Sequence, residues 1–433
     1  MSEALAASSP SSVATPVNSP ARVLIASLVG TTIEFFDFYV YATAAVLVFP
    51  RLFFASADPT SAVLQSFATF SIAFFARPLG AALFGHFGDK IGRKATLVAA
   101  LMTMGLSTVA IGFLPGYASI GVVAPLLLAL CRFGQGLGLG GEWGGAVLLA
   151  TENAPPEKRS WYAMFPQLGA PIGFILSSGS FLILGAVFTE QQFFDYGWRI
   201  PFIASLLLVG VGLYVRLKIA ETPEFQKAID KEERVAVPLV EIFARHKRSL
   251  VLGTLVAVAT FVLFYLMTVF SLSWGTAKLG FARQDFLVIQ LVGVVFFGLT
   301  IPLAGLLSDR FGRRRVLVLT TIGIGIFGLA MQPLFESGYA GAMAFCIIGL
   351  ALMGFTYGPI GAALASPFPV SVRYTGASMT FNLAGIVGAS LAPYIATWLA
   401  SSYGLAYVGY YLLAAAALSL VAMLLTPDSE LSS

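Results

Sequence analysis

The chain has 433 residues, of which 58% are hydrophobic and only 11% are charged. A soluble domain of this size carries about a quarter charged residues, so the composition excludes an ordinary soluble protein. The net charge of +4 is too small to indicate a nucleic-acid partner, and 2 His and 2 Cys residues are too few for a metal cluster. We therefore predict an all-α membrane protein with no nucleic-acid partner, no cofactor, no metal site and no catalytic site.

Twelve apolar segments follow one another along the chain, and each is long enough to cross a bilayer, which takes about 20 helical residues. Backbone groups in lipid must satisfy their own hydrogen bonds, so the segments are predicted to be helices. In the first half they fall at 23–49, 62–86, 95–114, 120–150, 160–187 and 199–217. In the second half they fall at 249–272, 286–307, 315–335, 341–366, 375–400 and 404–426.

Polar segments divide the chain into two six-helix halves. Residues 218–248 form a long charged stretch, which we interpret as a cytoplasmic linker between a first half at 21–217 and a second half at 249–427. Residues 1–20 are rich in Ser, Ala and Pro and are predicted to be a disordered cytoplasmic tail. Residues 428–433 form a short C-terminal tail.

The basic residues predict the orientation in the membrane. When both termini and the linker are placed in the cytoplasm, most of the 25 Lys and Arg residues fall on the cytoplasmic side. The basic residues that then fall outside are Arg51, Arg199, Lys278 and Arg283. An excess of this kind sets topology, so cytoplasmic N- and C-termini are expected.

One short pattern occurs twice, at equivalent places in the two halves. The first copy runs from Gly85 to Lys94 and reads GHFGDKIGRK, and the second runs from Gly305 to Arg314 and reads GLLSDRFGRR. Each copy connects the second and third apolar segments of its half. Two membrane-embedded halves built to one plan are typical of secondary transporters, in which one half rocks against the other.

Four further motifs accompany the repeated pattern. They are Glu34-Phe35-Phe36-Asp37-Phe38-Tyr39, Arg77-Pro78-Leu79-Gly80, Arg132-Phe133-Gly134-Gln135-Gly136 running into Gly140-Gly141-Glu142-Trp143, and Gly197-Trp198-Arg199-Ile200-Pro201-Phe202. With the repeat, they resemble the metabolite:H⁺ symporter branch of the major facilitator superfamily, which includes carriers of shikimate, α-ketoglutarate, citrate and proline or betaine. The resemblance implies a bacterial inner-membrane protein that imports a small metabolite with protons by alternating access. We expect a monomer.

The repeated pattern is predicted to form a cytoplasmic gate between the halves. A carboxylate just past one helix can meet the positive N-terminal end of a helix in the other half, and the basic residues can meet carboxylates nearby. The predicted gate residues are Gly85, Asp89, Arg93, Lys94, Glu152, Arg159, Gly305, Asp309, Arg313, Arg314 and Arg373. The sequence departs from the family pattern after the tenth segment, where Ser366-Pro367-Phe368-Pro369 replaces the usual acidic residue. Alternatively, the basic residues only set topology.

Ionisable residues within spans are costly and are functional candidates by default. Glu34 and Asp37 are three residues apart, so they share a helix face, and we expect Asp37 to pair with Arg132 as the proton-coupling site. An aspartate facing an arginine at this place resembles the coupling pair of related sugar:H⁺ symporters. Glu34 is the second candidate acid and Glu142 the third. A purely structural buried pair is the alternative interpretation.

Mid-span polar groups are the candidate substrate ligands. They are Tyr41, Arg77, Arg132, Gln135, Tyr265, Gln290, Tyr357 and Asn382, and each could instead cap or pack a helix. His86, next to the first copy of the repeat, is either structural or a proton relay. The best-supported function from the sequence is a symporter of a small organic acid or zwitterion. Efflux or exchange, and a sensor that no longer transports, remain alternatives.

Overall fold

The structure is a computed structural model that describes residues 20–54, 58–91, 93–152, 154–218, 238–369 and 372–427. Helices account for nearly all of these residues. Eleven of the described helical segments are long and apolar enough to cross a membrane, and Val98–Phe113 is a shorter apolar helix. The predicted all-α membrane fold is thereby confirmed.

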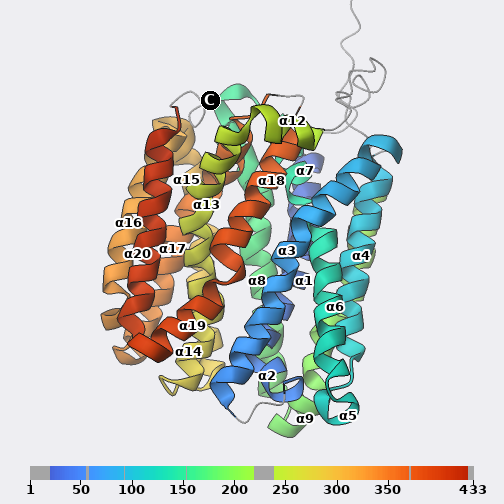
Figure 1. The fold of residues 1–433 in the computed structure, drawn as a ribbon, viewed down its shortest axis with the longest axis vertical. Coiled ribbons are helices and arrows are strands. Elements are labelled where there is room, and N and C mark those ends of the chain that lie inside the picture. The colour runs from blue at the N-terminus through green and yellow to red at the C-terminus, as the bar shows by residue number, and fades with distance from the viewer. Residues whose placement is uncertain are drawn as a thin grey trace, which may run out of the picture.

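The helices of the first half pack on the right of the bundle in Figure 1. They are α1 (Pro20–Leu47), α2 (Phe49–Leu52), α3 (Pro59–Ile91), α4 (Arg93–Phe113), α5 (Tyr117–Ile120), α6 (Val123–Leu139), α7 (Trp143–Glu152), the short turn η1 (Pro156–Lys158), α8 (Arg159–Val187), α9 (Glu190–Asp195), the short turn η2 (Gly197–Arg199) and α10 (Ile200–Lys218).

The helices of the second half pack on the left in the same view. They are α12 (Pro238–Arg245), α13 (Lys247–Tyr265), the wide π-helical turn η3 (Leu266–Phe270), α14 (Ser271–Ala277), α15 (Arg283–Phe311), α16 (Arg313–Phe335), α17 (Gly338–Ala365), α18 (Arg373–Gly385), the wide π-helical turn η4 (Ile386–Ser390), α19 (Ala392–Tyr403) and α20 (Leu405–Leu425).

The two ends of the bundle differ in what they carry. The linker helix α12 and the C-terminal end of the described chain lie at the upper end in Figure 1, whereas α2, α5, α9 and α14 lie at the lower end. The positive-inside rule assigns the upper end to the cytoplasm, because the basic residues of the repeated pattern also belong there. We call the two ends cytoplasmic and periplasmic below.

Several predicted segments differ from the structure. The fourth segment, expected as one helix over 120–150, is broken between α6 and α7, so that Gly140, Gly141 and Glu142 form a turn. Consecutive glycines favour this break because glycine loses more conformational freedom in a helix than any other residue does. The repeated pattern is also more helical than expected, since α15 runs on to Phe311 and α16 begins at Arg313. The chain reverses at Gly312, whose φ of +90° suits glycine.

Glycines let helices of the first half approach closely. A Cβ added to Gly80 of α3 would lie 2.0 Å from the carbonyl oxygen of Leu137, and one added to Gly140 would lie 2.0 Å from that of Arg77. No side chain fits into such a space, so α3 and α6 contact each other backbone to backbone.

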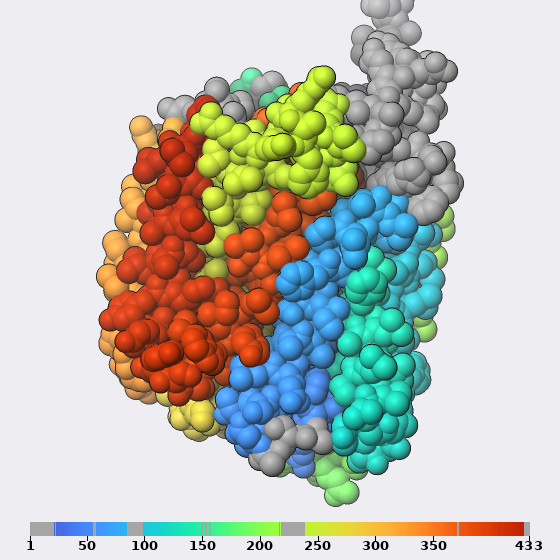
Figure 2. All heavy atoms as spheres, viewed as in Figure 1, coloured from blue at the N-terminus to red at the C-terminus, as the bar shows by residue number. Residues whose placement is uncertain are grey.

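The halves pack against each other along the length of the bundle. Helix α8 contacts α15 and α17, while α3 contacts α18 and η4. In the space-filling view, the atoms of α3 and α18 form a continuous surface across the front of the molecule (Figure 2).

Candidate functional site

Two buried arginines lie around the ring of Phe38 at the centre of the bundle. The guanidinium carbon of Arg132, from α6, lies 4.2 Å from the centroid of this ring, and that of Arg77, from α3, lies 4.7 Å from it. The Arg132 guanidinium also lies 4.1 Å from the ring centroid of Tyr41. Aromatic faces stabilise a desolvated cation by about 2 kcal/mol, so the rings lower the cost of burying these charges.

Hydrogen bonds satisfy only part of the two guanidinium groups. Arg132 Nε donates to the carbonyl oxygen of Phe70 at 3.2 Å, and Nη1 donates to Gln135 Oε1 at 3.0 Å. Arg132 Nη2 and Arg77 Nε are buried without a hydrogen-bond partner within the described ranges. An unsatisfied buried donor costs about 1–3 kcal/mol, and more when it is charged. The centre is thus suited to an anionic group that would accept from these donors.

Asp37 is fully buried, but it does not form the predicted direct pair with Arg132. Its Oδ1 accepts a hydrogen bond from the Ser205 hydroxyl of α10, and its side chain lies near Thr108 of α4, whose hydroxyl donates to the carbonyl oxygen of Met104 at 3.0 Å. No ion pair joins Asp37 and Arg132 in the part of the chain that the structure describes. The expected contact was wrong because Asp37 faces α4 and α10 inside the first half, whereas Arg132 is held by α3.

A chain of polar side chains connects the two residues instead. Gln135 accepts from Arg132 through Oε1, and its Nε2 donates to Thr108 Oγ1 at 2.8 Å. Thr108 in turn lies against Asp37. The predicted ligand Gln135 therefore bridges the base of the fourth span and the acid of the first.

Glu34 lies nearer the interface between the halves than Asp37 does. It is buried and interacts electrostatically with Tyr39 and with Tyr357 of α17, which belongs to the second half. Arg77 interacts with the same two tyrosines. The two acids of α1 therefore lie in different surroundings, although they are only three residues apart.

Aromatic rings from both halves surround this centre. The Tyr265 ring lies 5.6 Å from the rings of Phe70 and Phe74, both on α3, and 6.4 Å from that of Phe38. Tyr265 therefore brings α13 of the second half against the arginines of the first. Of the other predicted ligands, Tyr41 donates its hydroxyl to Thr69 Oγ1 at 3.0 Å.

The cytoplasmic side of the centre is closed by contacts between α7 and α18. The rings of Trp143 and Phe381 stack with centroids 3.7 Å apart. Trp143 Nε1 donates to Gln167 Oε1 at 3.1 Å, and Gln167 Nε2 donates to the carbonyl oxygen of Tyr357 at 3.1 Å. Trp143 and Gln167 were not among the predicted site residues. The Trp within a glycine-rich motif and the Gln in the middle of a span were the available signals.

The break between α6 and α7 supplies acceptors for the same closure. Asn382 Nδ2, from α18, donates to the carbonyl oxygen of Gly140 at 3.2 Å, and the Tyr374 hydroxyl donates to that of Gly141. Asn382, predicted as a substrate ligand, is therefore engaged in a contact between the halves. Glu142 lies in the break itself and is buried, so it does not continue the helical face of Arg132 and Gln135 as expected.

The second copy of the repeated pattern closes the cytoplasmic end in the way proposed for the pattern. Asp309 accepts hydrogen bonds from the backbone N–H groups of Ser160 at 3.1 Å and Trp161 at 3.0 Å. These groups belong to the first turn of α8, so a carboxylate of the second half caps a helix of the first. A Cβ added to Gly305 would meet the Ser160 carbonyl oxygen at 3.4 Å, so a small residue suits this approach.

Three basic residues near this contact lie against neutral oxygen atoms. Buried Arg313 lies with Nη1 3.5 Å from Ser366 Oγ, so the serine that replaces the family's acidic residue faces the basic residue of the pattern. Arg373 Nε donates to the carbonyl oxygen of Phe368 at 3.0 Å, and Arg314 Nη2 lies 3.5 Å from that of Leu424. Arg159, at the start of α8, is exposed.

Only the helical backbone of the first copy of the pattern is described, and Gly92 lies outside the described residues. The side chains of the predicted gate residues Gly85, Asp89, Arg93, Lys94 and Glu152, and that of His86, lie outside the described part of the structure. Their proposed roles stay predictions.

The periplasmic end is also closed between the halves. The Arg283 guanidinium, at the start of α15, lies 4.3 Å from the ring centroid of Phe193 in α9. A Cβ added to Gly185 of α8 would lie 2.0 Å from Gln284 Nε2. Contacts between the halves therefore exist on both sides of the arginines.

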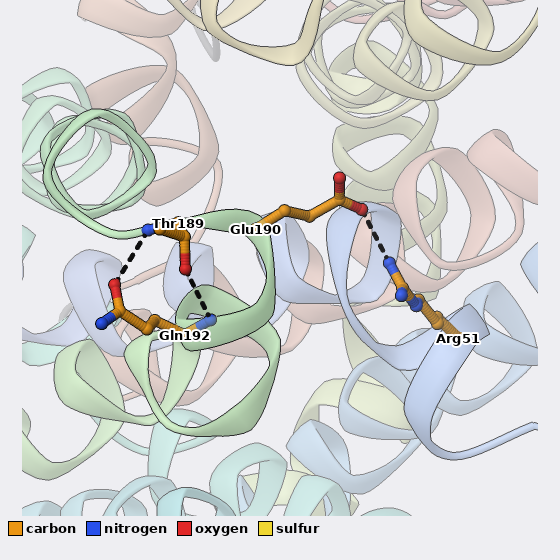
Figure 3. Close-up of polar contacts among 4 residues, drawn as sticks. All are labelled: Arg51, Thr189, Glu190 and Gln192. Atoms are coloured by element: carbon orange, nitrogen blue, oxygen red, sulfur yellow. Dashed lines mark hydrogen bonds and ion pairs between the residues drawn. The ribbon is translucent and has the colours of Figure 1, made fainter.

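Within the first half, an ion pair joins α2 to α9 at the periplasmic end, beside this closure (Figure 3). Arg51 Nη1 lies 2.9 Å from Glu190 Oε1, and both side chains are more than half exposed. A capping box between Thr189 and Gln192 begins α9. Because exposed ion pairs contribute little to stability, the box and the packing of Phe193 hold α9 in place.

Replacing Asp309 by Asn is expected to raise the fraction of molecules that open to the cytoplasm. The amide lacks the charge that favours a helix N-terminus, a loss of about 0.3–1 kcal/mol, and it offers only one acceptor oxygen to the two N–H groups. A matched control is Asp285→Asn at the other end of the same helix, where Asp285 is exposed. Labelling of a single cysteine at Val147 by an impermeant maleimide measures the opening, and unchanged labelling would contradict the gate.

Comparisons with known proteins agree with this architecture. The family described as Sugar (and other) transporter matches residues 22–241, and the Major Facilitator Superfamily matches residues 278–433. The chain is 58% identical to the inner membrane metabolite transport protein YhjE of Escherichia coli strain K12, over 96% of each chain. It is 35% identical to the shikimate transporter of the same organism, over 94% of this chain and 95% of that one.

A solved structure shares the fold. The crystal structure of a D-xylose-proton symporter matches with a TM-score of 0.73 at 16% identity, over 94% of this chain and 98% of the other. The inner-membrane location expected from the sequence agrees with the name of the YhjE relative. The chain belongs to the major facilitator superfamily, and it is a multi-pass membrane transporter of small metabolites rather than an enzyme.

Proposed function

We propose that the protein is a symporter that imports a small organic acid or a zwitterion together with protons. The observation that carries this proposal is the pair of buried arginines, Arg77 and Arg132, with guanidinium nitrogens left unsatisfied between two closed ends. A carboxylate on the substrate would accept from these nitrogens, and the charge-assisted hydrogen bonds would repay part of the cost of burial. The names of relatives, which include a shikimate transporter and proline/betaine transporters, support a small substrate of this kind.

Proton coupling is assigned to Asp37, with Glu34 as the competing acid. Binding of an anion at Arg132 changes the hydrogen bonding of Gln135, whose amide donates to Thr108 beside Asp37. Substrate binding at one end of the chain is thereby linked to proton binding at the other. Glu34 supports an alternative route, because it shares the tyrosines of the interface with Arg77.

The contacts at the two ends provide the alternation of access. Opening to the cytoplasm separates Trp143 from Phe381 and Asp309 from the start of α8. Opening to the periplasm separates Arg283 from Phe193 and Gln284 from Gly185. Because the arginines lie between these two sets of contacts, a substrate bound there would be exposed to one side at a time.

Uptake into proteoliposomes is expected to follow an imposed pH gradient. Vesicles with an alkaline interior and a clamped membrane potential should accumulate the substrate from a panel of organic acids and amino-acid derivatives, and a protonophore should remove the accumulation. Protein-free vesicles and vesicles with equal internal and external pH are the controls. Uptake that ignores both the gradient and the protonophore would exclude symport. Accumulation only with the opposite gradient would favour efflux, and no flux of any substrate would favour a sensor.

A further inference from the structure

The helix that presents Tyr265 to the two arginines is not regular. After Tyr265, α13 passes into the wide turn η3, which ends at Phe270, and then continues as α14. A π turn holds an additional residue, so some backbone carbonyls around it lose their regular helical partners, and such turns occur frequently at functional sites. All five residues of η3 are buried, so water does not replace the lost partners.

Gln290 of the neighbouring helix α15 supplies partners for this turn. Its Nε2 donates to the carbonyl oxygen of Thr268 at 2.6 Å and to that of Met267 at 3.1 Å, and it lies 3.2 Å from Ser271 Oγ. If the amide of Gln290 were flipped, its oxygen would face these carbonyl oxygens, which are also acceptors. Gln290 Oε1 is buried and has no hydrogen-bond partner among the described residues. The side chain is therefore engaged through its amino group, toward η3.

A glycine on a third helix accommodates the same turn. A Cβ added to Gly349 of α17 would lie 2.2 Å from Met267 Sδ. The wide turn thus displaces Met267 into a space that only glycine leaves open, and Gln290 and Gly349 support η3 from two sides. One residue of a helix corresponds to about 100° of rotation, so loss of the wide turn would rotate α13 relative to α14.

We propose that Gln290 is a positioning residue, which holds the wide turn so that Tyr265 is placed against the arginine site, the site formed by Arg77 and Arg132. The residues just before η3 are those that reach across the interface. Tyr265 lies against Phe70 and Phe74, while the Phe264 ring lies 5.5 Å from that of Tyr39 in α1. This assignment deepens the proposed function and rests on it, because it gives Gln290 an indirect role in the affinity of the same site.

The test compares Gln290→Leu and Gln290→Glu, which both lack the amide donors, with Gln332→Leu as control. Gln332 belongs to the same half and donates to Glu336 at 3.1 Å on the surface of the bundle. Hydrogen exchange of the segment 264–272, measured in nanodiscs without substrate, should accelerate at least about tenfold in both Gln290 variants, equivalent to about 1.4 kcal/mol. KM for the substrate should rise by a similar factor, with a smaller change in kcat, and neither quantity should change in the control.

A double-mutant cycle separates positioning from simple stabilisation. If Gln290 acts through Tyr265, then Gln290→Leu should add little to the rise in KM that Tyr265→Ala causes alone. Gly349→Ala should reproduce the Gln290 variants, and Met267→Ala should relieve Gly349→Ala, which keeps the proposal testable where a Gln290 variant does not fold.

The proposal would be overturned if the Gln290 variants left both hydrogen exchange and KM unchanged. It would also be overturned if they lowered thermal stability without changing KM. Additive effects of Gln290→Leu and Tyr265→Ala would do the same. Hydrogen exchange needs no substrate or proton gradient, whereas failure of the proposed symport appears as uptake by the unmodified protein that ignores the pH gradient. The two failures are therefore distinguishable.

Discussion

Replacing Asp37 by Asn is expected to abolish accumulation of the substrate while leaving its exchange across the membrane. Asn keeps the size of the side chain and can still accept from Ser205, but it cannot bind and release a proton. With one proton per substrate and an imposed gradient of about two pH units, the unmodified protein can accumulate substrate up to about 100-fold, since each unit is worth about 1.4 kcal/mol. The variant should stay near equal concentrations. Exchange needs no net release of protons, so it should continue.

The measurement is proton flux beside substrate flux in proteoliposomes. Asp58→Asn is the matched control, because Asp58 lies outside the spans. Hydrogen bonds from Ser61 hold the pKa of the Asp58 carboxyl below its usual value, so this carboxyl stays ionised near neutral pH. Thr108→Val interrupts the chain to Gln135 and should weaken coupling without removing the acid. If Asp37→Asn still concentrates substrate and Glu34→Gln does not, the proton site is Glu34. If both variants remain coupled, Glu142 and His86 become the candidates.

The sequence was sufficient for the architecture because hydrophobic length and the repeated pattern are local signals. Segments of about 20 apolar residues need no knowledge of their neighbours to be recognised as spans. The repeated pattern also predicted that a carboxylate of one half caps a helix of the other half. The structure shows this contact for Asp309 with the start of α8, while Asp89 stays a prediction.

The pairing of side chains at the centre could not be predicted because it depends on rotation between helices. Spacing placed Asp37 and Glu34 on one face of α1, but three residues are about 60° short of a full turn, enough to direct one acid to α10 and the other toward α17. A polar residue in a span also does not reveal its partner. Gln290 and Asn382 were expected to bind substrate, but their amides contact backbone carbonyls of η3 and of the break between α6 and α7.

Tryptophan at Gly144 or at Gly185 is expected to trap the transporter in opposite states. A Cβ at Gly144 would lie 1.9 Å from Ser378 Oγ of α18, and one at Gly185 would lie 2.0 Å from Gln284 Nε2 of α15. Both neighbours belong to the second half, so a large side chain prevents closure of the cytoplasmic end in the first variant and of the periplasmic end in the second. Overpacking costs about 1–3 kcal/mol even where the surroundings yield. A difference of that size shifts an equilibrium between two states about 5- to 150-fold.

Single cysteines report the trapped states, after Cys131 and Cys346 have been replaced. Gly144→Trp should expose a cysteine at Val147, which packs near Gly361 of α17, and Gly185→Trp should expose one at Gln284. Each variant should lose net transport. Tryptophan at Gly179 of α8 or Gly210 of α10, where no neighbouring atom lies within 4 Å of an added Cβ, should be tolerated.

These variants are informative because Gly144→Trp is expected to open the cytoplasmic end and Gly185→Trp the periplasmic end. A general loss of folding would expose both cysteines in both variants, whereas two alternating gates require each variant to expose one and protect the other. Protection follows because the same two halves form both closures, so a rotation that separates Gly185 from Gln284 presses Trp143 onto Phe381. Labelling of both positions in either variant would show that the ends open independently, and the arginine site would then not be exposed to one side at a time.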